Sequence, residues 1–362
     1  MSLLYDARLV ENSGIGTTIR GQLREILSRK IPITLTGNSR QLASHSLTGV
    51  PVIPFDAKLY SIKEQTSFPR ASHARIHVPH YNAPLRYLSH CSVTVHDLIH
   101  LQSDEFKHPA YRAYASLMLS QIARRSPCIL TVSETTRSQF LSRYPEARHR
   151  TFTTLNGIDH KLFRPASSGA VAALKKKHSL PDEYFLAIGI GKKHKNIDFA
   201  LRALKHLWKD TDCPPIVLAG AGGKIPSYAT HAMMENSVRK NVILLPHVPE
   251  SDLPAVYSSA LALIMPSLLE GFGLPALEAM ACGTPVLAST GGSLPEVIGH
   301  AARFFDPRDE DAFIHAVQVV LQDSKQRARL RSLGLSQAAG FTWKRNVDAM
   351  MRAYHHTGFE DS

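Results

Sequence analysis

The sequence predicts an α/β protein built from parallel sheets with helices on both faces, and three observations support this class. Short apolar runs alternate with longer segments of helical periodicity along most of the 362 residues, which is the order typical of βαβ units. Hydrophobic residues make up 44% and charged residues 20% of the chain, a globular composition. A chain of this length exceeds one ordinary core, so about two domains are expected.

The expected strands fall into two groups of similar size. In the first half we predict strands near residues 3–5, 33–36, 74–78, 92–95 and 129–132. In the second half we predict strands near residues 184–188, 215–219, 242–245, 262–265, 285–288 and 302–305. Each half therefore has enough strands for a sheet of its own.

A stretch rich in Asn, Gly, Pro and Ser separates the two halves. It reads NGIDHKLFRPASSG and spans residues 156–169, and such punctuation is typical of an interdomain connection. We place the boundary near Pro165, which gives domains of residues 1–165 and 166–341. After Gly340 the stretch FTWKRNVDAMMRAYHH has helical apolar spacing and predicts a last helix over about 342–358.

Charge and cysteine usage narrow the class of protein further. The chain has 42 Lys and Arg against 30 Asp and Glu, a net charge of +12, which favours nucleic acid, phosphorylated ligands or an anionic membrane surface as partners. Its four cysteines form no CxxC pair, so neither a zinc ribbon nor a disulfide framework is indicated. The first residues lack a signal-peptide pattern, and no apolar run reaches the ~18 residues of a membrane span. We expect a cytoplasmic protein.

Histidines are frequent between residues 77 and 108, where HxxH and HxxxH spacings occur. Metal sites of this kind need accompanying ligands such as carboxylates at matching positions. None stands at ligand spacing here, so we expect no metal ion.

The most informative stretch is EGFGLPALEAMACGTPVLAS, residues 270–289. Glycines at 271 and 273 allow a sharp turn, and Pro275 suits the first position of a helix. Free amides and the positive end of that helix favour an anion, while Glu270 and Glu278 are acceptors for hydroxyl groups. A sugar joined to a diphosphate offers both. The plainer alternative is a β–α turn whose glutamates face solvent.

This stretch resembles the E-x7-E signature of retaining GT-B glycosyltransferases of family four, and the resemblance extends over nearly the whole chain. It implies two Rossmann-like domains with parallel sheets facing across a cleft, with the last helix crossing back onto the first domain. The nucleotide sugar would bind mainly to the second domain and the acceptor to the first. Glu270 would stabilise the transferring sugar or act as a nucleophile, and Glu278 would hold the ribose. The same resemblance assigns the donor loop to Gly271, Phe272, Gly273 and Leu274.

A basic turn, GIGKKHKNID at residues 189–198, resembles the family's clamp on the donor diphosphate. Lys195 and Asn196 stand at its usual Lys-Asn positions. The preceding arginine of the family pattern is His194 here, so Lys192 or Lys193 is the candidate for the second charge. Cations are most useful where the leaving diphosphate gains charge. The alternative is a solvent-exposed basic helix start.

Two loops of the first half also match the family. SGIGTTIRGQL, residues 13–23, places Gly14 and Gly16 where similar enzymes approach the donor phosphates; a tight turn with positive φ is the alternative. CSVTVHDLIHL, residues 91–101, ends a strand with His96 and Asp97. The resemblance implies that His96 contacts the sugar hydroxyls and the leaving group. Asp97 either orients it or caps the next helix.

Two other loops are expected to be architectural. Ser133 is placed to cap a helix. Gly291 and Gly292 resemble the loop that closes beneath the nucleotide, and Glu296 is expected to be structural.

The resemblance is strongest to bacterial mannosyltransferases of polysaccharide and lipopolysaccharide O-antigen assembly, which implies GDP-mannose as donor. UDP-glucose and dTDP-rhamnose stay open. The implied acceptor is a growing, lipid-linked oligosaccharide, reached by peripheral contact with the anionic inner face of the cytoplasmic membrane. No DxD pair occupies a matching loop, so no metal cofactor is expected.

Two other classes of protein were weighed against this interpretation. A nicotinamide-dependent oxidoreductase is disfavoured because GIGTTI lacks the third glycine of G-x-G-x-x-G. A basic nucleic-acid-binding protein without transferase activity would explain the charge, but aromatic residues are only 7% of the chain and no basic-aromatic platform is apparent.

Overall fold

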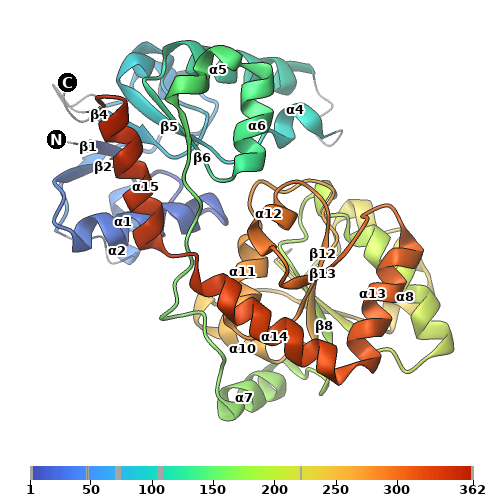
Figure 1. Cartoon of the computed structure of the whole chain (residues 1–362). Helices are drawn as coiled ribbons and strands as arrows, with labels where there is room; N and C mark the ends of the chain where they lie inside the picture. Colours follow the sequence, from blue (N-terminus) through green and yellow to red (C-terminus); the bar gives the residue numbers. More distant parts are fainter. Residues whose placement is uncertain are drawn as a thin grey trace. The chain divides into compact units, whose positions relative to one another are not determined.

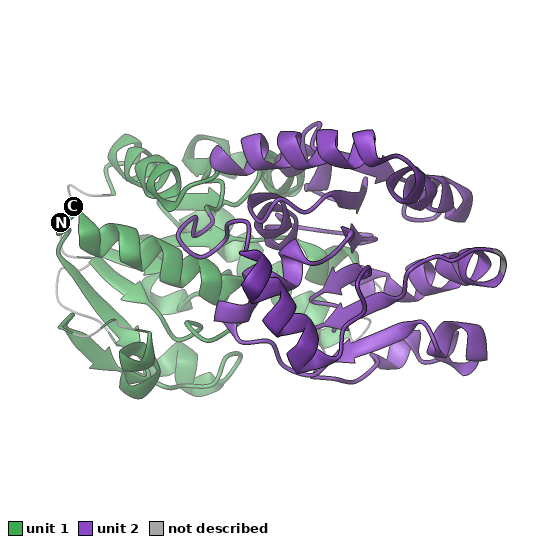
Figure 2. Cartoon of the chain, turned by 90° about the horizontal axis from the view of Figure 1, so that it is seen from below, with its two compact units in different colours: residues 1–157, 341–362 green, residues 158–340 purple. Residues whose placement is uncertain are grey.

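The chain forms two compact units in a computed structural model, which describes residues 3–45, 47, 49–69, 75–103, 109–220 and 222–359. Unit 1 comprises residues 1–157 and 341–362, and unit 2 comprises residues 158–340 (Figure 2). Each unit has its own parallel sheet and its own buried cores. The prediction of an α/β chain with two Rossmann-like domains is therefore confirmed.

Among the described residues of unit 1, seven parallel strands pair in the order β3-β2-β1-β4-β5-β6-β7. The strands are β1 (Leu3–Asp6), β2 (Ile33–Gly37), β3 (Val52–Pro54), β4 (Arg75–Val78), β5 (Cys91–Val95), β6 (Cys128–Thr131) and β7 (Thr151–Thr153). The strands β1, β5 and β6 are buried at every residue, as strands covered on both faces require.

Two strands of this sheet were not anticipated, and both lie at its edges. β3 and β7 have three residues each, and β3 ends in Pro54. Short edge strands containing proline give a weak sequence signal, because proline removes a ladder donor and partial exposure permits polar residues. Residue 74, the first of one expected strand, lies outside the described residues.

Helices surround the unit 1 sheet, and the end of the chain returns to it. They are α1 (Ile15–Ser28), α2 (Ser39–Ser44), α3 (Ile62–Thr66), α4 (Ile99–Gln102), α5 (Pro109–Arg125), α6 (Glu134–Arg143) and α15 (Trp343–His356). Helix α15 packs on α1 (Figure 1). The contact requires Gly21, because a Cβ there would lie 2.0 Å from the Trp343 ring.

In the described part of unit 2, six parallel strands pair in the order β10-β9-β8-β11-β12-β13. They are β8 (Phe185–Ile188), β9 (Ile216–Ala219), β10 (Val242–Leu245), β11 (Ala262–Met265), β12 (Val286–Ser289) and β13 (Ala302–Phe305). The longer helices are α7 (Ser168–His178), α8 (Ile197–Asp210), α10 (Leu253–Ser258), α11 (Leu274–Ala281), α12 (Leu294–Ile298), α13 (Glu310–Gln322) and α14 (Ser324–Ala339). Helices α8 and α13 pack together, and α11 packs on α10 and α14.

Unit 2 begins at Ile158, several residues before the boundary suggested near Pro165. The intervening residues pack into unit 2, where the Phe163 ring meets Tyr257 edge to face at 6.2 Å. The amide of Ala166 also donates to Ser258 Oγ at 3.0 Å. The Asn, Gly, Pro and Ser residues therefore indicated the connection between the domains, but the packing of its apolar residues determined where unit 2 starts.

Both sheets have one point where the strand order reverses, between β1 and β4 in unit 1 and between β8 and β11 in unit 2. In open parallel sheets, consecutive connections diverge at such a point to opposite faces and leave a crevice beyond the carboxyl ends of the two strands. Ligands of open parallel sheets bind at such switch points.

Candidate functional site

The loops after β8 and β11 lie together at the switch point of unit 2. The amide of Leu268 donates to the carbonyl of His194 at 2.8 Å. Asn196 adopts a left-handed backbone with φ of 58°, and its side-chain amide donates to the carbonyls of Pro266 at 3.1 Å and Pro307 at 2.9 Å. Asn196 therefore joins three loops of this edge, a structural role that its place in the basic turn did not reveal.

The side chains of Lys195 and Glu270 meet between these two loops. Lys195 Nζ lies 2.6 Å from Glu270 Oε1, which also accepts from Ser267 Oγ at 3.3 Å. The Glu270 side chain is 9% exposed and that of Lys195 is 21% exposed. The structure thus brings two predicted site residues into one partly buried ion pair, which is formed through the Oε1 atom of the carboxylate.

The loop before α12 supports Glu270 through contacts with its backbone. The Glu270 carbonyl accepts from the amide of Ser293 at 3.0 Å and from its hydroxyl at 3.2 Å. A Cβ on Gly292 would lie 2.3 Å from that carbonyl oxygen, and one on Gly291 would lie 2.2 Å from the Ser267 carbonyl oxygen. Both glycines are therefore required for backbone-to-backbone packing, and together with Ser293 they hold the Glu270 loop in place.

Helix α11 begins at Leu274, one residue earlier than expected, with Pro275 in its first turn. Gly273 precedes it at φ of 96°, a conformation that favours glycine, and a Cβ there would also meet Leu294 at 2.6 Å. The side chains of Phe272 and Leu274 are buried, at 5% and 9% exposure. Contact of these residues and Gly271 with a donor therefore has to use backbone amides.

Glu278 lies one turn inside α11 and is held by a residue that the sequence did not single out. The buried Tyr257 hydroxyl donates to Glu278 Oε2 at 2.7 Å. Burial, followed by the nearby Glu278 charge, raises the pKa of Tyr257 well above its ordinary value, so the phenol stays protonated and remains a donor. Tyr257 belongs to α10, so only the packing of α10 on α11 brings the pair together.

The basic side chains of the turn at residues 192–195 differ in their exposure to solvent. Lys192 and Lys193 are exposed, whereas the His194 side chain is buried. Lys195, half-buried, is the residue that reaches Glu270. The two exposed lysines stay candidates for the second cation of a diphosphate clamp.

In unit 1, His96 follows β5 and its ring is oriented by the neighbouring strand connection. His96 Nε2 lies 2.8 Å from the carbonyl oxygen of Pro79. Because a carbonyl only accepts, Nε2 carries the proton and Nδ1 presents a lone pair. Burial lowers the pKa of His96, so the imidazole is neutral at pH 7 and is suited to accept a hydrogen bond from a hydroxyl group.

Asp97 is bonded at the start of α4, and its charge also acts on His96, where it opposes the larger effect of burial on the pKa of the ring. Its Oδ1 accepts from the amide of Ile99 at 2.9 Å, at the start of α4. Ser133 caps α6 as expected, since its hydroxyl accepts from the Thr136 amide at 3.0 Å. Both residues therefore have a role in local structure.

The backbone geometry of the loop before α1 explains why glycine occupies positions 14 and 16. Gly14 precedes α1 at φ of 72°, and a Cβ on Gly16 would lie 2.6 Å from the carbonyl oxygen of Val10. The turn that was the alternative explanation is therefore present. Contact of Gly14 and Gly16 with a donor stays a prediction.

Comparison with known proteins identifies the family. The family model for glycosyl transferases group 1 matches residues 172–336, within unit 2. The chain is 33% identical over 281 residues to O-antigen chain mannosyltransferase B of Escherichia coli, covering 76% of this chain and 73% of that protein. This chain belongs to the group 1 glycosyltransferases. The family resemblance drawn from the sequence motifs is confirmed.

Other relatives share a smaller part of their length with this glycosyltransferase. O-antigen chain mannosyltransferase RfbU of Salmonella typhimurium is 28% identical over 246 residues, covering 67% of this chain and 64% of that protein. Serotype-specific mannosyltransferase WbdA of Escherichia coli is 29% identical over 274 residues, and the chain spans only 33% of it.

Solved structures agree in fold along the full chain. Sucrose-phosphate synthase of Thermosynechococcus elongatus superposes with a TM-score of 0.76 at 20% identity, over 100% of both chains. Anabaena HepE, solved with UDP and glucose, superposes with a TM-score of 0.76 at 16% identity, over 98% of this chain and 99% of that one. At these identities the likeness establishes the fold.

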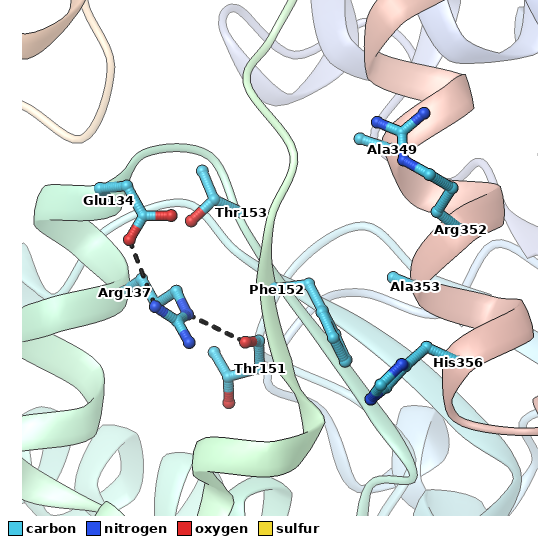
Figure 3. A pocket seen from close by; sticks show the side chains of 9 residues that line it. All are labelled: Glu134, Arg137, Thr151, Phe152, Thr153, Ala349, Arg352, Ala353 and His356. Carbon is cyan, nitrogen blue, oxygen red and sulfur yellow. Dashed lines mark hydrogen bonds and ion pairs between the residues drawn. The ribbon is translucent and has the colours of Figure 1, made fainter.

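A groove of about 350 Å³ lies in unit 1 of the glycosyltransferase, between α6, β7 and α15 (Figure 3). Arg137 donates from Nε to the Thr151 carbonyl at 2.9 Å and also pairs with Glu134 at 3.3 Å. The Phe152 ring meets His356 edge to face at 5.3 Å. The Arg137–Thr151 bond joins α6 to the edge strand β7, and the Phe152–His356 contact joins α15 to it. The groove includes none of the predicted catalytic or donor-binding residues.

Two features are absent from the described residues. No helix there is both long and apolar enough to cross a membrane. No group of three or more His, Cys, Asp or Glu side chains gathers there as a set of metal ligands.

Proposed function

We propose that the chain is a retaining hexosyltransferase that moves mannose from GDP-mannose to a growing, lipid-linked oligosaccharide. The family supplies the reaction class, and the names of the O-antigen mannosyltransferases that it resembles supply the sugar. The single observation that carries the proposal is the Lys195–Glu270 ion pair at the switch point of unit 2, beside the amino end of α11.

This edge of unit 2 has the chemistry needed for a nucleoside diphosphate. Lys195 brings a cation, and residues 271–274 bring backbone amides at the positive end of a helix. Lys195 Nζ has three protons, so it can bind a phosphate oxygen while it retains Glu270. These groups stabilise the diphosphate most as it leaves, when its charge increases. We therefore propose that no metal ion is required.

Glu270 is proposed to stabilise the sugar rather than to attack it. Pairing of Oε1 with Lys195 and Ser267 withdraws electron density from the carboxylate and fixes its orientation. Oε2 is then presented to a sugar hydroxyl and to the positive charge that develops at the anomeric carbon. The Gly292 and Ser293 contacts to the Glu270 backbone supply the rigidity that such positioning requires.

Glu278 is proposed to accept from the ribose hydroxyls. Its Oε2 already binds the Tyr257 hydroxyl, so the carboxylate is held ready for a vicinal diol. In unit 1, the lone pair of His96 Nδ1 is proposed to accept from a hydroxyl of the transferring sugar. In the overall reaction the bond from the anomeric carbon to the diphosphate oxygen breaks, and the acceptor oxygen bonds to that carbon. The acceptor proton leaves with the nucleoside diphosphate.

The acceptor is proposed to be reached at an anionic membrane surface. The net charge of +12 favours reversible binding to such a surface. Flotation with vesicles containing phosphatidylglycerol should carry the protein upward, and vesicles of phosphatidylcholine alone should not. Equal flotation, or none, would contradict this part of the proposal.

The donor is tested by thermal unfolding with GDP-mannose, UDP-glucose and dTDP-rhamnose, followed by transfer assays with the labelled sugar. A ligand that binds only the native state raises the unfolding temperature. We expect GDP-mannose to give the largest rise and to be hydrolysed or transferred. A larger rise with another nucleotide sugar would change the donor. No rise with any nucleotide sugar, together with salt-sensitive retention on DNA, would favour the nucleic-acid-binding alternative.

A further inference from the structure

Three tyrosines of unit 1 gather into one group, Tyr60, Tyr81 and Tyr114, here called the tyrosine platform. The rings of Tyr60 and Tyr114 meet edge to face at 5.5 Å, and the hydroxyls of Tyr60 and Tyr81 lie 3.3 Å apart. Tyr60 is 48% exposed, and the other two are half-buried. An exposed aromatic ring supported by two others offers a rigid apolar face edged with hydroxyl groups.

Tyr60 is held in a conformation that a bulky residue rarely adopts. Its φ is 63°, and non-glycine residues held there concentrate at ligand-binding and active sites. The Tyr60 amide donates to Glu64 Oε2 at 2.8 Å. Glu64 is fully buried and paired with Arg8 at 2.7 Å. A buried carboxylate therefore fixes the backbone that presents the Tyr60 ring.

The same carboxylate anchors Tyr114. The Asn82 side-chain amide donates to Glu64 Oε2, and the Tyr114 hydroxyl donates to Asn82 Oδ1. Asn82 is 1% exposed. Burial, then the charge of Glu64, raises the pKa of Tyr114 to about 12, so its phenol is neutral and remains a donor at physiological pH.

A buried network of charged side chains supports the platform. Burying charges costs desolvation free energy, and we take positioning of the platform as the reason for this cost. Arg8 binds Asp6 through Nε at 2.9 Å and through its Nη2 atom at 2.7 Å. Its guanidinium also packs over the rings of Phe55 and Phe68 at 5.2 and 5.5 Å. Arg8 thereby ties the segment that contains Tyr60 and Glu64 to the end of β1.

The platform also lies where a parallel sheet binds ligands. Asp6 is the last residue of β1, and Tyr81 and Asn82 follow the end of β4. These are the two strands on either side of the unit 1 switch point. The proposed donor groups Lys195 and Glu270 occupy the corresponding switch point of unit 2.

We propose that the tyrosine platform binds a pyranose ring of the oligosaccharide acceptor. This inference rests on the proposed glycosyl transfer. A pyranose has a face of C–H groups that packs on an aromatic ring, and its equatorial hydroxyls pair with phenol groups at the ring's edge. Stacking on the Tyr60 ring would orient the acceptor sugar, and Tyr81 and Tyr114 would support the ring and supply hydroxyls.

The principal alternative ligand is an apolar one, such as a lipid chain. The neighbouring Ile62 allows an experiment to distinguish a lipid chain from a sugar. Ile62 is 83% exposed, more than Tyr60, so contact with an apolar phase would involve Ile62 at least as strongly. Binding by ring stacking would depend on Tyr60 and would be insensitive to Ile62.

The test measures transfer to methyl glycosides, which have no alkyl tail, using the glycoside among mannose, glucose and N-acetylglucosamine that the wild type extends best. Tyr60→Leu keeps apolar bulk but removes the ring, Tyr60→Phe keeps the ring, and Ile62→Ala is the matched control. We expect Tyr60→Leu to raise the acceptor KM about tenfold while the donor KM changes less than about twofold. Tyr60→Phe should raise the acceptor KM no more than about threefold, and Ile62→Ala should leave it unchanged.

An unchanged acceptor KM in Tyr60→Leu would overturn the platform, as would a larger effect of Ile62→Ala. Thermal unfolding of each variant separates misfolding from lost binding, and Tyr60→Phe keeps the test valid if Tyr60→Leu misfolds. Failure of the wild type to hydrolyse or transfer any nucleotide sugar would instead refute the proposed function.

Discussion

Lys195 Nζ and Glu270 Oε1 lie 2.6 Å apart and join the loop after β8 to the loop after β11. The two residues are separated by 75 positions in sequence, yet parallel pairing of β8 with β11 brings the ends of their strands together. In the proposed function this cation and carboxylate would serve the two ends of the same reaction, the leaving diphosphate and the transferring sugar.

Replacing Lys195 with Met should weaken donor binding. We expect the GDP affinity measured by calorimetry to fall at least about tenfold, because a charge-assisted contact is worth roughly 1.4 kcal/mol or more. Unfolding should also become about 1–3 kcal/mol easier, because Glu270 loses its partner in a partly buried site. Lys177→Met, which breaks the exposed Lys177–Asp252 pair at 2.8 Å, should change neither GDP affinity nor stability by a comparable amount. Equal GDP affinity in Lys195→Met would remove this lysine from the donor site.

Replacing Glu270 with Gln should abolish transfer while the protein still folds. The amide keeps the size of the side chain but loses the negative charge that faces the developing positive charge of the sugar. We expect kcat to fall at least about 100-fold with a small change in the donor KM. Circular dichroism and thermal unfolding check the fold. Turnover within about threefold of the wild type would contradict the assignment.

Removal of the Tyr257 hydroxyl should disturb Glu278 specifically. Tyr257→Phe deletes the 2.7 Å bond to Oε2, and we expect the donor KM to rise several-fold and the free energy of unfolding to fall by about 1.5–3 kcal/mol. Tyr184→Phe is the matched control, since this buried tyrosine of the same unit binds the Val256 carbonyl at 3.0 Å. The control should lose stability without a change in the donor KM. Parallel kinetic changes in both variants would mean that the Tyr257 effect is only structural.

Gly292→Ala should displace Glu270 through its backbone. The added Cβ would lie 2.3 Å from the Glu270 carbonyl oxygen, and we expect kcat to fall about 100-fold, the effect of a shift near 1 Å. Gly299→Ala is a close control, because Gly299 has φ of 60° against 61° for Gly292, but its Cβ would meet only the Gln337 side chain at 3.3 Å. Both variants force a positive φ on alanine, and Gly299, with ψ of −130°, adds further backbone strain. Thermal unfolding of each variant accounts for this strain, and a larger loss of kcat in Gly292→Ala then measures the clash. If both lose the same activity, support of Glu270 by this loop is refuted.

Acid should destabilise unit 1 through His77. This residue is buried in β4, with Nδ1 2.8 Å from the Tyr354 hydroxyl, and burial lowers its pKa to about 3. The unfolded chain binds a proton near pH 6.5 and the folded one does not. Stability is therefore fully present above about pH 6.5 and is lost as the pH falls toward 3, by up to about 1.4 kcal/mol per pH unit. His77→Gln, which keeps an acceptor for Tyr354, should flatten the pH dependence of the urea midpoint between pH 7.5 and 5. An unaltered slope would show that His77 does not contribute.

The alternation of elements and the glycine-bounded carboxylate motif were sufficient to predict the α/β class and the family. Every strand in the described part of unit 2 was anticipated, because the central strands are continuous apolar runs and the edge strands β10 and β13 are mostly apolar as well. The edge strands β3 and β7 were not, because each has only three residues of mixed burial, which form no distinctive pattern. The start of unit 2 likewise depended on where Phe163 packs.

Within the site, the sequence alone determined which residue types stand where strands end, since Glu270, Lys195 and His96 all follow predicted strands. Tertiary structure alone decided which of these side chains meet and what holds them. Tyr257 reaches Glu278, Gly292 packs on Glu270, and Glu64 fixes Tyr60 and Tyr114. Hydrogen bonds between distant segments depend on how elements pack in space, and a one-dimensional pattern contains the periodicity of each element but not the distance between two of them.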